Sequence, residues 1–424
     1  MVGTQAGLCV SNYNPKLRHY HLFHFIDILS HIPYIHANFV KKKSPIRPKS
    51  SRRSPLRPTI AEIDLQAIAF NLKGVRARVG RNVRIMAVVK ANAYGHGIEG
   101  VSKYVERSLA DYFGVAFVEE GTALRRAGIR KPVHVFALPS PNQASLFVDG
   151  RLEPTVCTAG NIRVLQSAAA RGRRTLAVHV KIDTGMNRIG VKRGVLPELL
   201  KELGKANRVE IKGVFTHFAN SDEREKGFMN EQLREFESAL EYLSGQKVEP
   251  ELIHCANSAA ILDAPQTYFS MVRPGVMMYG CYPSRTTSES IPLRPAMTIK
   301  TRTALVKWIE QGESVSYGRR YYAARRTKIA TLPIGYADGF SRLLSGKATA
   351  LIGGKEYPVA GTICMDQLMV DVGEDDVAEG AEAILVGSQG ERNIGLGDLA
   401  GKIGTIPYEI CCAISSRVPR VYRS

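Results

Sequence analysis

The chain has 424 residues, of which 44% are apolar, and both values are typical of a globular protein with about two domains. Its formal net charge of +19 is concentrated in residues 1–58, which hold ten Lys and Arg side chains against one acid, and the mild excess elsewhere argues against a nucleic-acid-binding protein. The seven cysteines include no C-x-x-C pair, which argues against a zinc site and a disulfide framework, and no apolar run of about 18 residues predicts a membrane span.

The first 58 residues differ in composition from everything that follows. They hold five of the ten histidines, an apolar stretch over 22–40 that Asp27 and Pro33 interrupt, three lysines at 41–43, and a run rich in Pro, Arg and Ser. The apolar part is too polar for a secretory signal, and the positive cluster follows it instead of preceding it. A start codon assigned too far upstream or a disordered extension is favoured over an organelle transit peptide. We therefore expect a cytoplasmic protein.

From Thr59 to about residue 292, helical and extended patterns alternate. Apolar residues at helical spacing predict helices over 65–80, 97–110, 119–130, 161–172, 195–206 and 227–245. Runs rich in β-branched residues predict strands over 83–90, 111–118, 133–138, 175–185, 209–218, 251–259 and 270–280. Roughly eight strand–helix units in a segment of this length predict a (β/α)₈ barrel over 59–292.

After Pro292 the hydrophobic pattern changes. Apolar and polar residues alternate over 297–310, 327–335, 347–372 and 381–387, and Gly-rich turns lie between these segments. Alternation at period two is typical of half-buried strands. The sequence therefore predicts a separate, mostly β domain over 293–424.

The segment 87–97, AVVKANAYGHG, carries the most specific chemistry. It places Lys90 at the end of a predicted strand, where partial burial would disfavour the ammonium form. A neutral amine is what a Schiff base to an aldehyde cofactor requires. A solvated lysine at a strand end would explain Val-Val-Lys alone, but the whole string resembles the pyridoxal-phosphate (PLP) lysine motif of alanine racemase.

Other predicted strand ends carry unusual polar residues over 181–190, 216–222, 254–260 and 273–280. A single histidine such as His217 is more often a satisfied core residue than a ligand. The functional residues of a barrel, however, gather at the carboxyl ends of its strands. Several such segments on one face therefore favour a site.

The resemblance to alanine racemase extends over residues 59–423. In the β domain it rests on the segments 315–321, 333–342, 361–372 and 405–422, which occur in the family's order and spacing. The resemblance implies PLP as the cofactor and interconversion of L-alanine and D-alanine, which supplies D-alanine for peptidoglycan in bacteria.

The resemblance also implies a role for each residue that matches a family position. Lys90 would hold the cofactor and then act as one base, and Tyr317 would act as the second base from the opposite face of the substrate. His217 and Arg273 would be linked to the tyrosine through hydrogen bonds. Arg273 would face the pyridine nitrogen and keep it neutral, since an arginine cannot accept a proton.

The remaining implied contacts concern the phosphate and the substrate. Phosphate requires hydroxyls and main-chain N–H groups, and the matching residues are Tyr94, Ser258, Gly275, Val276 and Tyr408. Arg188 would bind both the cofactor's phenolate oxygen and the substrate carboxylate, with help from the main-chain N–H of Met365. Lys181 matches a lysine that is often carbamylated in the family and braces Arg188.

The family builds its active site from two subunits, so the resemblance implies a homodimer in which Tyr317 and Met365 come from the partner. One position departs from the family, because Thr362 stands where an arginine of the substrate corridor is usual. Asp222 and Arg342 match other corridor positions.

Several alternatives belong to the same barrel class. A PLP-dependent decarboxylase would carry a Gly-rich phosphate loop and a catalytic cysteine in its β domain, and neither occurs in the expected form. A small PLP carrier would lack the β domain altogether. A broad-specificity amino-acid racemase stays open, although Tyr408 and the region of Met365 would crowd the side-chain pocket and favour alanine.

Overall fold

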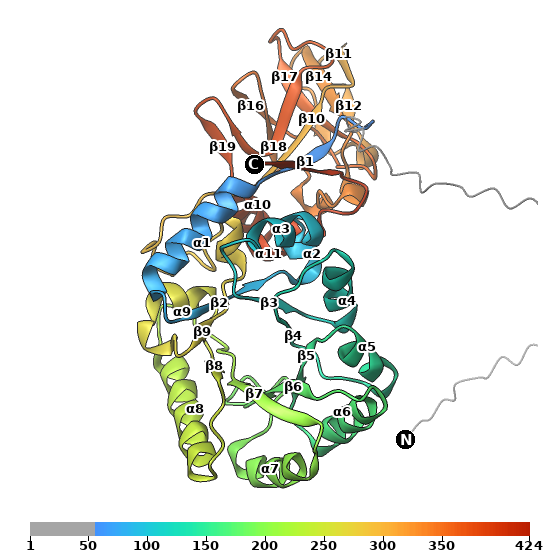
Figure 1. Ribbon diagram of the computed structural model, residues 1–424. Coiled ribbons are helices and arrows are strands. Elements are labelled where there is room, and N and C mark those ends of the chain that lie inside the picture. The colour runs from blue at the N-terminus through green and yellow to red at the C-terminus, as the bar shows by residue number, and fades with distance from the viewer. Residues whose placement is uncertain (1–55) are drawn as a thin grey trace, which may run out of the picture. The chain divides into compact units, whose positions relative to one another are not determined.

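The structure is a computed structural model that describes residues 56–424 (Figure 1). The expectations for the N-terminal extension therefore lie outside the described residues, except at its last three positions. Among these, Arg57 donates to the Asp338 carboxylate at 2.5 and 2.6 Å and to the Pro333 carbonyl at 2.8 Å. Arg57 is therefore tied to the folded chain.

Eight parallel strands form the first sheet, in the order β8-β7-β6-β5-β4-β3-β2-β9. These strands are β2 (Arg84–Val88), β3 (Tyr112–Val115), β4 (Val133–Val135), β5 (Glu153–Val156), β6 (Leu176–Lys181), β7 (Val209–Phe215), β8 (Leu252–His254) and β9 (Met271–Val272). Its two outer strands are joined by backbone hydrogen bonds, from Ser270 N to Ile253 O at 3.2 Å and from Arg273 N to Ala256 O at 3.0 Å. The sheet thus closes into the predicted barrel.

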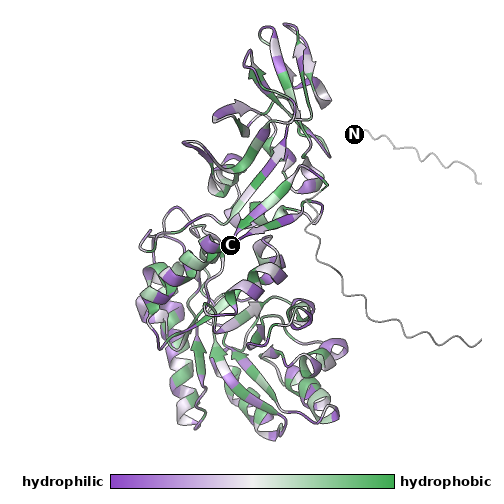
Figure 2. Cartoon of the chain, turned by 45° about the horizontal axis from the view of Figure 1, so that its top comes forward, coloured by the Kyte–Doolittle hydropathy of each residue, from purple (hydrophilic) through white to green (hydrophobic). Residues whose placement is uncertain are grey.

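Helices surround this sheet because their apolar residues recur on one side. In α7 (Leu196–Lys205), the residues Leu196, Leu199 and Leu203 are buried, which is the spacing of a single helical face. The other helices are α1 (Leu65–Val79), α3 (Ile98–Val105), α4 (Val118–Arg126), α5 (Ala144–Asp149), α6 (Ala159–Arg171), α8 (Gly227–Gly245) and α9 (Ser258–Asp263). Figure 2 shows hydrophobic residues gathered in the barrel strands, whereas the helices alternate in hydropathy.

The fold class is as predicted, but the sequence pattern missed α5, β5 and α9. Strand β5 contains Pro154, which lacks an N–H donor and is usually excluded from strand interiors. It is accommodated near the start of the strand, where Val135 of β4 lies opposite Pro154 and the ladder to β6 begins only at Thr155. The sequence pattern thus predicted seven of the eight barrel strands, and the missing strand did not change the predicted fold.

The C-terminal part of the chain is mostly β, as predicted. One sheet has the order β16-β15-β18-β10-β1-β20, with β19 on β18, and two smaller sheets are β11-β14-β17 and β12-β13. The strands are β10 (Met297–Arg302), β11 (Leu305–Ile309), β12 (Ser314–Val315), β13 (Tyr321–Tyr322), β14 (Thr327–Leu332), β15 (Thr349–Ile352), β16 (Lys355–Pro358), β17 (Leu368–Gly373), β18 (Glu382–Gln389), β19 (Arg392–Ile394) and β20 (Arg420–Arg423). Two helices, α10 (Leu396–Ile403) and α11 (Pro407–Ala413), were not predicted.

The first strand that the structure describes, β1 (Ile60–Asp64), lies in this second sheet and not in the barrel. It pairs antiparallel with β10, with Ile63 opposite Met297, and parallel with β20, with Ala61 opposite Arg420. The extended segment that precedes the first barrel helix therefore ties the two parts of the chain together.

None of the helices within residues 56–424 combines the length and the hydropathy that a membrane-spanning segment requires.

Candidate active site

A cavity of about 800 Å³ lies at the carboxyl ends of the barrel strands. Its walls come from strand ends and from the loops that follow them, which is where barrel enzymes place their chemistry. The cavity brings together nine residues that the sequence singled out for the cofactor, namely Lys90, Tyr94, Arg188, His217, Ser258, Arg273, Gly275, Val276 and Tyr408. Lys181 and Asp222 also line it.

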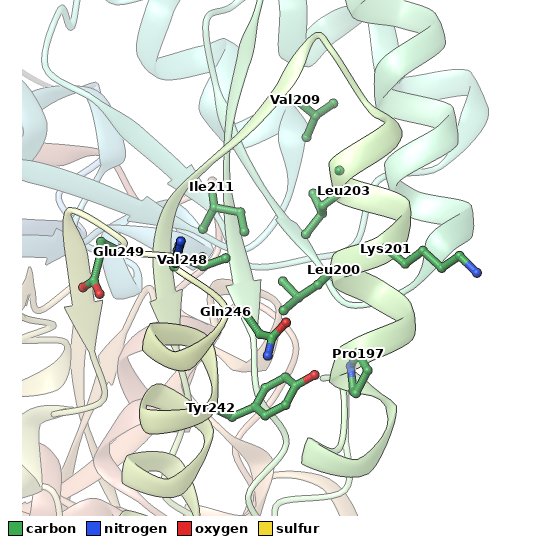
Figure 3. Close-up of a pocket in the computed structure, with 12 residues that line it drawn as sticks. Pro197, Leu200, Lys201, Leu203, Val209, Ile211, Tyr242, Gln246, Val248 and Glu249 are labelled. Atoms are coloured by element: carbon green, nitrogen blue, oxygen red, sulfur yellow. The ribbon is translucent and has the colours of Figure 1, made fainter.

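A second cavity, of about 640 Å³, lies at the opposite end of the barrel strands (Figure 3). It lies between the end of α7, the start of β7 and the segment after α8, and aliphatic side chains such as Leu200 and Ile211 line it. Lys201 points away from it in Figure 3. The titratable residues that line this second cavity are Lys201, Tyr242, Lys247 and Glu249. The nine residues that the sequence singled out for the cofactor line the first cavity, so the chemistry is placed there.

Lys90 begins an unusual left-handed turn. The φ angles of Ala91, Asn92, Ala93 and Tyr94 are 52°, 55°, 55° and 50°, although a left-handed turn costs about 1–2 kcal/mol per ordinary residue. The sequence analysis predicted only a strand end at Lys90 and no left-handed turn after it.

Local hydrogen bonds and close packing stabilise this turn. Glu120 accepts from Ala91 N at 2.6 Å, and the Asn92 side chain accepts from Ile98 N at 2.9 Å. A Cβ on Gly95 would lie 2.0 Å from the carbonyl oxygen of Cys411, so only glycine allows α11 to approach this closely. The backbone on either side of Lys90 is therefore firmly held.

The surroundings of Lys90 favour its neutral form. Burial, followed by the nearby positive charge of Arg188, lowers the pKa of the Lys90 ammonium. Tyr94 experiences the opposite effect, because burial raises the pKa of its phenol and keeps it a hydrogen-bond donor. The cavity thus holds an amine suited to nucleophilic and base chemistry.

A cluster of neutral donors lies at one end of the cavity. Ser258 Oγ accepts from Gly275 N at 2.9 Å, and the ring of Tyr94 lies 5.1 Å from Tyr279 and 5.9 Å from Tyr408. A Cβ on Gly275 would approach the Tyr94 hydroxyl to 2.8 Å, so a side chain there would occupy the space between these donors. Hydroxyls and main-chain N–H groups in this arrangement suit a phosphate.

Arg273 is buried at the base of the cavity and donates five hydrogen bonds. Its NH1 group donates to His254 Nδ1 and His254 O, both at 2.8 Å. Its NH2 group donates to Thr216 O at 2.9 Å, Cys255 O at 2.9 Å and His217 Nδ1 at 3.1 Å. Within residues 56–424 no carboxylate lies within 4.0 Å of the guanidinium. Burial lowers the pKa of Arg273 to about 10.

His217 and Lys181 are influenced by this arginine. Burial and then the charge of Arg273 hold the pKa of His217 well below its ordinary range, so its imidazole is neutral. Burial, together with Arg188 and Arg273, lowers the pKa of Lys181 to about 8. The Lys181 ammonium lies 5.6 Å from the centroid of the Phe215 ring. With such a pKa, a substantial fraction of the Lys181 side chains is unprotonated near pH 8.

Tyr317 and Met365 are not brought to this cavity within one chain. Both belong to the C-terminal part, and their side chains are 71% and 51% exposed. Ser316, which precedes Tyr317, has φ 69° and ψ −177°. This conformation is strained for any residue except glycine. Ser316 Oγ donates to Thr362 O at 2.5 Å, and Thr362 Oγ1 donates to Tyr317 O at 2.8 Å.

The sequence analysis missed some residues of the cavity. Cys412, from the unpredicted helix α11, lines it, as do Phe136 and Asn257. No sequence signal marks Cys412 as a site residue, because only the close approach of α11 to the left-handed turn brings it there. The cysteines from Cys157 onward are free thiols. In the part of the chain that the structure describes, no group of three His, Cys, Asp or Glu side chains could hold a metal ion.

Comparisons with known proteins show which family the chain resembles over its length. Residues 63–283 match the family model described as alanine racemase, N-terminal domain, and residues 296–422 match alanine racemase, C-terminal domain. Alanine racemase from Halothermothrix orenii is 43% identical over 369 residues, and that from Symbiobacterium thermophilum is 44% identical over 368 residues. Each alignment covers 87% of this chain and 97% of the relative. The structure of alanine racemase from Bacillus anthracis with bound L-Ala-P has a TM-score of 0.84 and 36% identity, covering 88% of this chain and 96% of that chain.

Proposed function

This chain belongs to the alanine racemase family, and we propose that it interconverts L-alanine and D-alanine with Lys90 and Tyr317 as its two bases. It is an isomerase that depends on PLP. One observation carries the assignment of residues: the cavity joins a lysine of lowered pKa to a buried arginine and a cluster of neutral donors. A broad-specificity racemase is not favoured, because the relatives named above are alanine racemases.

The residues of the cavity fit PLP. The hydroxyls of Tyr94, Ser258 and Tyr408 and the main-chain N–H groups of Gly275 and Val276 would hold its phosphate. All five residues line the cavity, and a Cβ on Gly275 would lie 2.8 Å from the Tyr94 hydroxyl and 3.7 Å from Ser258 Oγ. Lys90 would attach to its aldehyde carbon, and Arg273 would face its ring nitrogen. When bound, PLP supplies an electron-withdrawing ring that acidifies the α-hydrogen of an attached amino acid.

Lys90 and Tyr317 would act on opposite faces of the substrate. Racemisation requires one group to remove the α-proton from one face and another to return a proton to the other face. The neutral Nζ of Lys90 takes up or delivers the proton on one side, and the Tyr317 Oη does so on the other. Each direction of the reaction uses the two bases in opposite order.

Arg273 would restrain the ring nitrogen. A guanidinium has donors only, so it cannot pass a proton to a carboxylate or accept one from the ring. The cavity also offers no carboxylate near this group. Arg273 would therefore offer the ring nitrogen of PLP no acidic carboxyl group, and this arrangement would favour a rapid return of the proton over side reactions.

The substrate carboxylate would be bound by Arg188 and by the main-chain N–H of Met365. Lys181 lies in the same cavity as Arg188, and its lowered pKa suits carbamylation, which would convert it into an anionic brace for that arginine. A methyl side chain is the size that Tyr408 and Met365 would leave room for.

The exposure of Tyr317 and Met365 supports a homodimer. Neither residue lines the cavity that holds Lys90, so a single chain presents both halves of the site but does not join them. In a two-fold dimer, the β region of each chain, 293–424, would cover the barrel region, 59–292, of its partner. We further propose that the enzyme works in the cytoplasm and supplies D-alanine for peptidoglycan.

The test is an absorbance spectrum of the purified protein with added PLP, recorded beside Lys90→Ala and followed by an assay of D-alanine from L-alanine. A band of the lysine-bound cofactor that changes in the variant, with D-alanine formed by the wild type only, would support the cofactor, the lysine and the reaction together. A band without D-alanine would point to another amino acid as substrate. No band would contradict the role of Lys90.

A further inference from the structure

A line of hydrogen-bonded side chains runs along the inside of the barrel, away from the active site. Arg273 NH1 lies 2.8 Å from His254 Nδ1, and His254 Nε2 lies 2.9 Å from His179 Nδ1. His179 Nε2 lies 2.8 Å from the Glu153 carboxylate. Glu153 is the first residue of β5, so the line crosses from the carboxyl ends of the strands to their amino ends. We call these four residues the Arg–Glu line.

The chemistry of the two ends fixes every proton in between. A guanidinium only donates, so His254 Nδ1 must accept and the proton of His254 must be on Nε2. That proton can only be donated to His179 Nδ1, which places the proton of His179 on its own Nε2. The Glu153 carboxylate accepts it. Both imidazoles are then neutral, and each carries its proton on Nε2.

The surroundings support this neutral state. Both imidazoles are fully buried, and the ring of His134 packs against that of His179 with centroids 4.1 Å apart and the ring planes tilted by 35°. Burial, followed by the charge of Arg273, holds the pKa of His254 well below its ordinary range. The Glu153 side chain retains 14% exposure, so the line ends at a partly hydrated carboxylate.

Arg273 also has a second branch. Its NH2 group donates to His217 Nδ1 at 3.1 Å, which leaves the proton of His217 on Nε2 by the same reasoning. The orientation of one guanidinium therefore decides the tautomers of His217 on one side and of His254 on the other. A partner that holds the guanidinium in this orientation acts on both.

We propose that Glu153 is a positioning residue of the active site that acts through His179 and His254 to hold Arg273 in a single orientation, an inference that rests on the proposed function. The carboxylate only accepts and the guanidinium only donates, so the Arg–Glu line has one arrangement of protons. Glu153 is also the anionic end of a network whose cationic end has no carboxylate of its own. Arg273 thus keeps its positive charge, although no carboxylate lies beside it at the place where the ring nitrogen of PLP would be.

The test compares Glu153→Gln with Glu153→Asp. Glutamine has nearly the shape of glutamate, but its amide can turn either its oxygen or its NH₂ group to His179. With the NH₂ group turned inward, the protons of both imidazoles would reverse and His254 Nδ1–H would face Arg273. Aspartate keeps the charge and the single direction. The matched control is Glu251→Gln. Glu251 is a carboxylate at the same end of the barrel, and it pairs with Arg84 and Lys212.

The first readout is ¹⁵N NMR of histidine-labelled full-length protein, with and without PLP. We expect His179 and His254 of the wild type to carry their protons on Nε2, and we expect a second set of signals in Glu153→Gln only. The second readout is kinetic: kcat falls about tenfold in Glu153→Gln with KM nearly unchanged, whereas Glu153→Asp and Glu251→Gln stay within about twofold of the wild type.

The outcomes separate this inference from the proposed function. A wild type that does not racemise alanine contradicts the proposed function, while the tautomers can still be as inferred. A wild type that racemises alanine but has His254 protonated on Nδ1, or a Glu153→Gln variant identical to the wild type in both readouts, overturns the role of Glu153. If Glu153→Gln does not fold, Glu153→Ala takes its place in both readouts, and a variant identical to the wild type again overturns the role of Glu153.

Discussion

The two halves of the candidate site are built differently. The barrel half contains Lys90, His217 and Arg273, and the hydrogen bonds of the buried Arg273, including the one to His217, are made within one chain. The other half, with Tyr317 and Met365, lies on the surface of the C-terminal part and makes no contact with the cavity. The barrel half gathers its groups within one chain, whereas Tyr317 and Met365 lie outside the cavity of the same chain.

The exposed half is nevertheless held in place. Tyr317 follows the strained Ser316, and side-chain hydrogen bonds fasten both residues to Thr362. Strain of this kind persists only where the surroundings determine the conformation, and it gathers at functional sites. Several large apolar side chains are exposed in the same C-terminal part, among them Tyr317, Tyr322, Tyr336, Leu343, Met365 and Ile406. Such exposure is typical of a surface that another chain covers.

The largest effect should come from a change in the exposed half. We expect Tyr317→Phe to lower kcat by about 10²–10⁴-fold in both directions, since this is the usual contribution of a positioned acid or base. The free energy of unfolding should change by less than about 0.5 kcal/mol, because the side chain is exposed. Steady-state kinetics in each direction and urea unfolding measure the two quantities.

Tyr322→Phe is the matched control, because Tyr322 is an exposed tyrosine of the neighbouring strand β13. It should leave kcat unchanged. Equal losses in the two variants would remove Tyr317 from the chemistry.

Mixed dimers test whether the halves of the site come from different chains. Lys90→Ala and Tyr317→Phe should each be nearly inactive alone. When the two are co-expressed at equal levels, random pairing gives one site in about four that carries neither substitution, if each site is shared across a two-fold dimer. We therefore expect about a quarter of the wild-type activity. Activity no higher than that of the separate variants would place Lys90 and Tyr317 in the same chain's site.

In the buried half, substitution should change stability as well as activity. Arg273→Leu leaves the carbonyl oxygens of Thr216 and Cys255 without their donor, and an unsatisfied buried group costs about 1–3 kcal/mol. Removing a buried charge offsets part of this loss, so we expect the free energy of unfolding to fall by about 3 kcal/mol. Urea unfolding measures it.

Arg188→Leu provides the comparison for the buried arginine. Arg188 lines the same cavity but is exposed and makes no ion pair in the described part of the chain. Its replacement should raise KM for alanine while leaving the free energy of unfolding nearly unchanged. A large loss of stability in Arg188→Leu would contradict the contrast between a buried and an exposed arginine.

Features that depend on local sequence signals were predicted, whereas those that depend on packing between distant segments were not. Alternating strands and helices predicted the barrel, and the motif around Lys90 predicted the cavity, because both signals are local. The left-handed turn at Ala91 to Tyr94 was missed, since three of its four residues are types that rarely adopt positive φ. The position of Cys412 was missed because it depends on packing between α11 and that turn.

The Arg–Glu line was missed for a different reason. Glu153 begins β5, which the sequence pattern did not predict because the strand contains Pro154. His179 lies in the middle of an apolar strand, where a histidine is usually a satisfied core residue. Only the closed barrel brings β5, β6 and β8 together, so that residues 26 and 75 positions apart form hydrogen bonds. No spacing along the chain predicts contacts of this kind.

The smallest effect concerns Thr362, at the position where the resemblance to the family led us to expect an arginine. Its hydroxyl donates to the carbonyl of Tyr317 at 2.8 Å, and its side chain is 2% exposed. Thr362→Val keeps the shape and removes one hydrogen bond, so we expect a loss of about 1 kcal/mol in unfolding free energy. Because that bond fixes the backbone of Tyr317, kcat should also fall severalfold.

A matched buried threonine separates these two effects. Thr301 of β10 shares a 2.8 Å hydrogen bond with Thr59 and lies in the sheet, away from the cavity. Thr301→Val should lose a similar unfolding free energy with kcat unchanged. If kcat falls equally in both variants, the hydroxyl of Thr362 contributes only to stability, and the strained backbone at Ser316 alone positions the exposed half of the site.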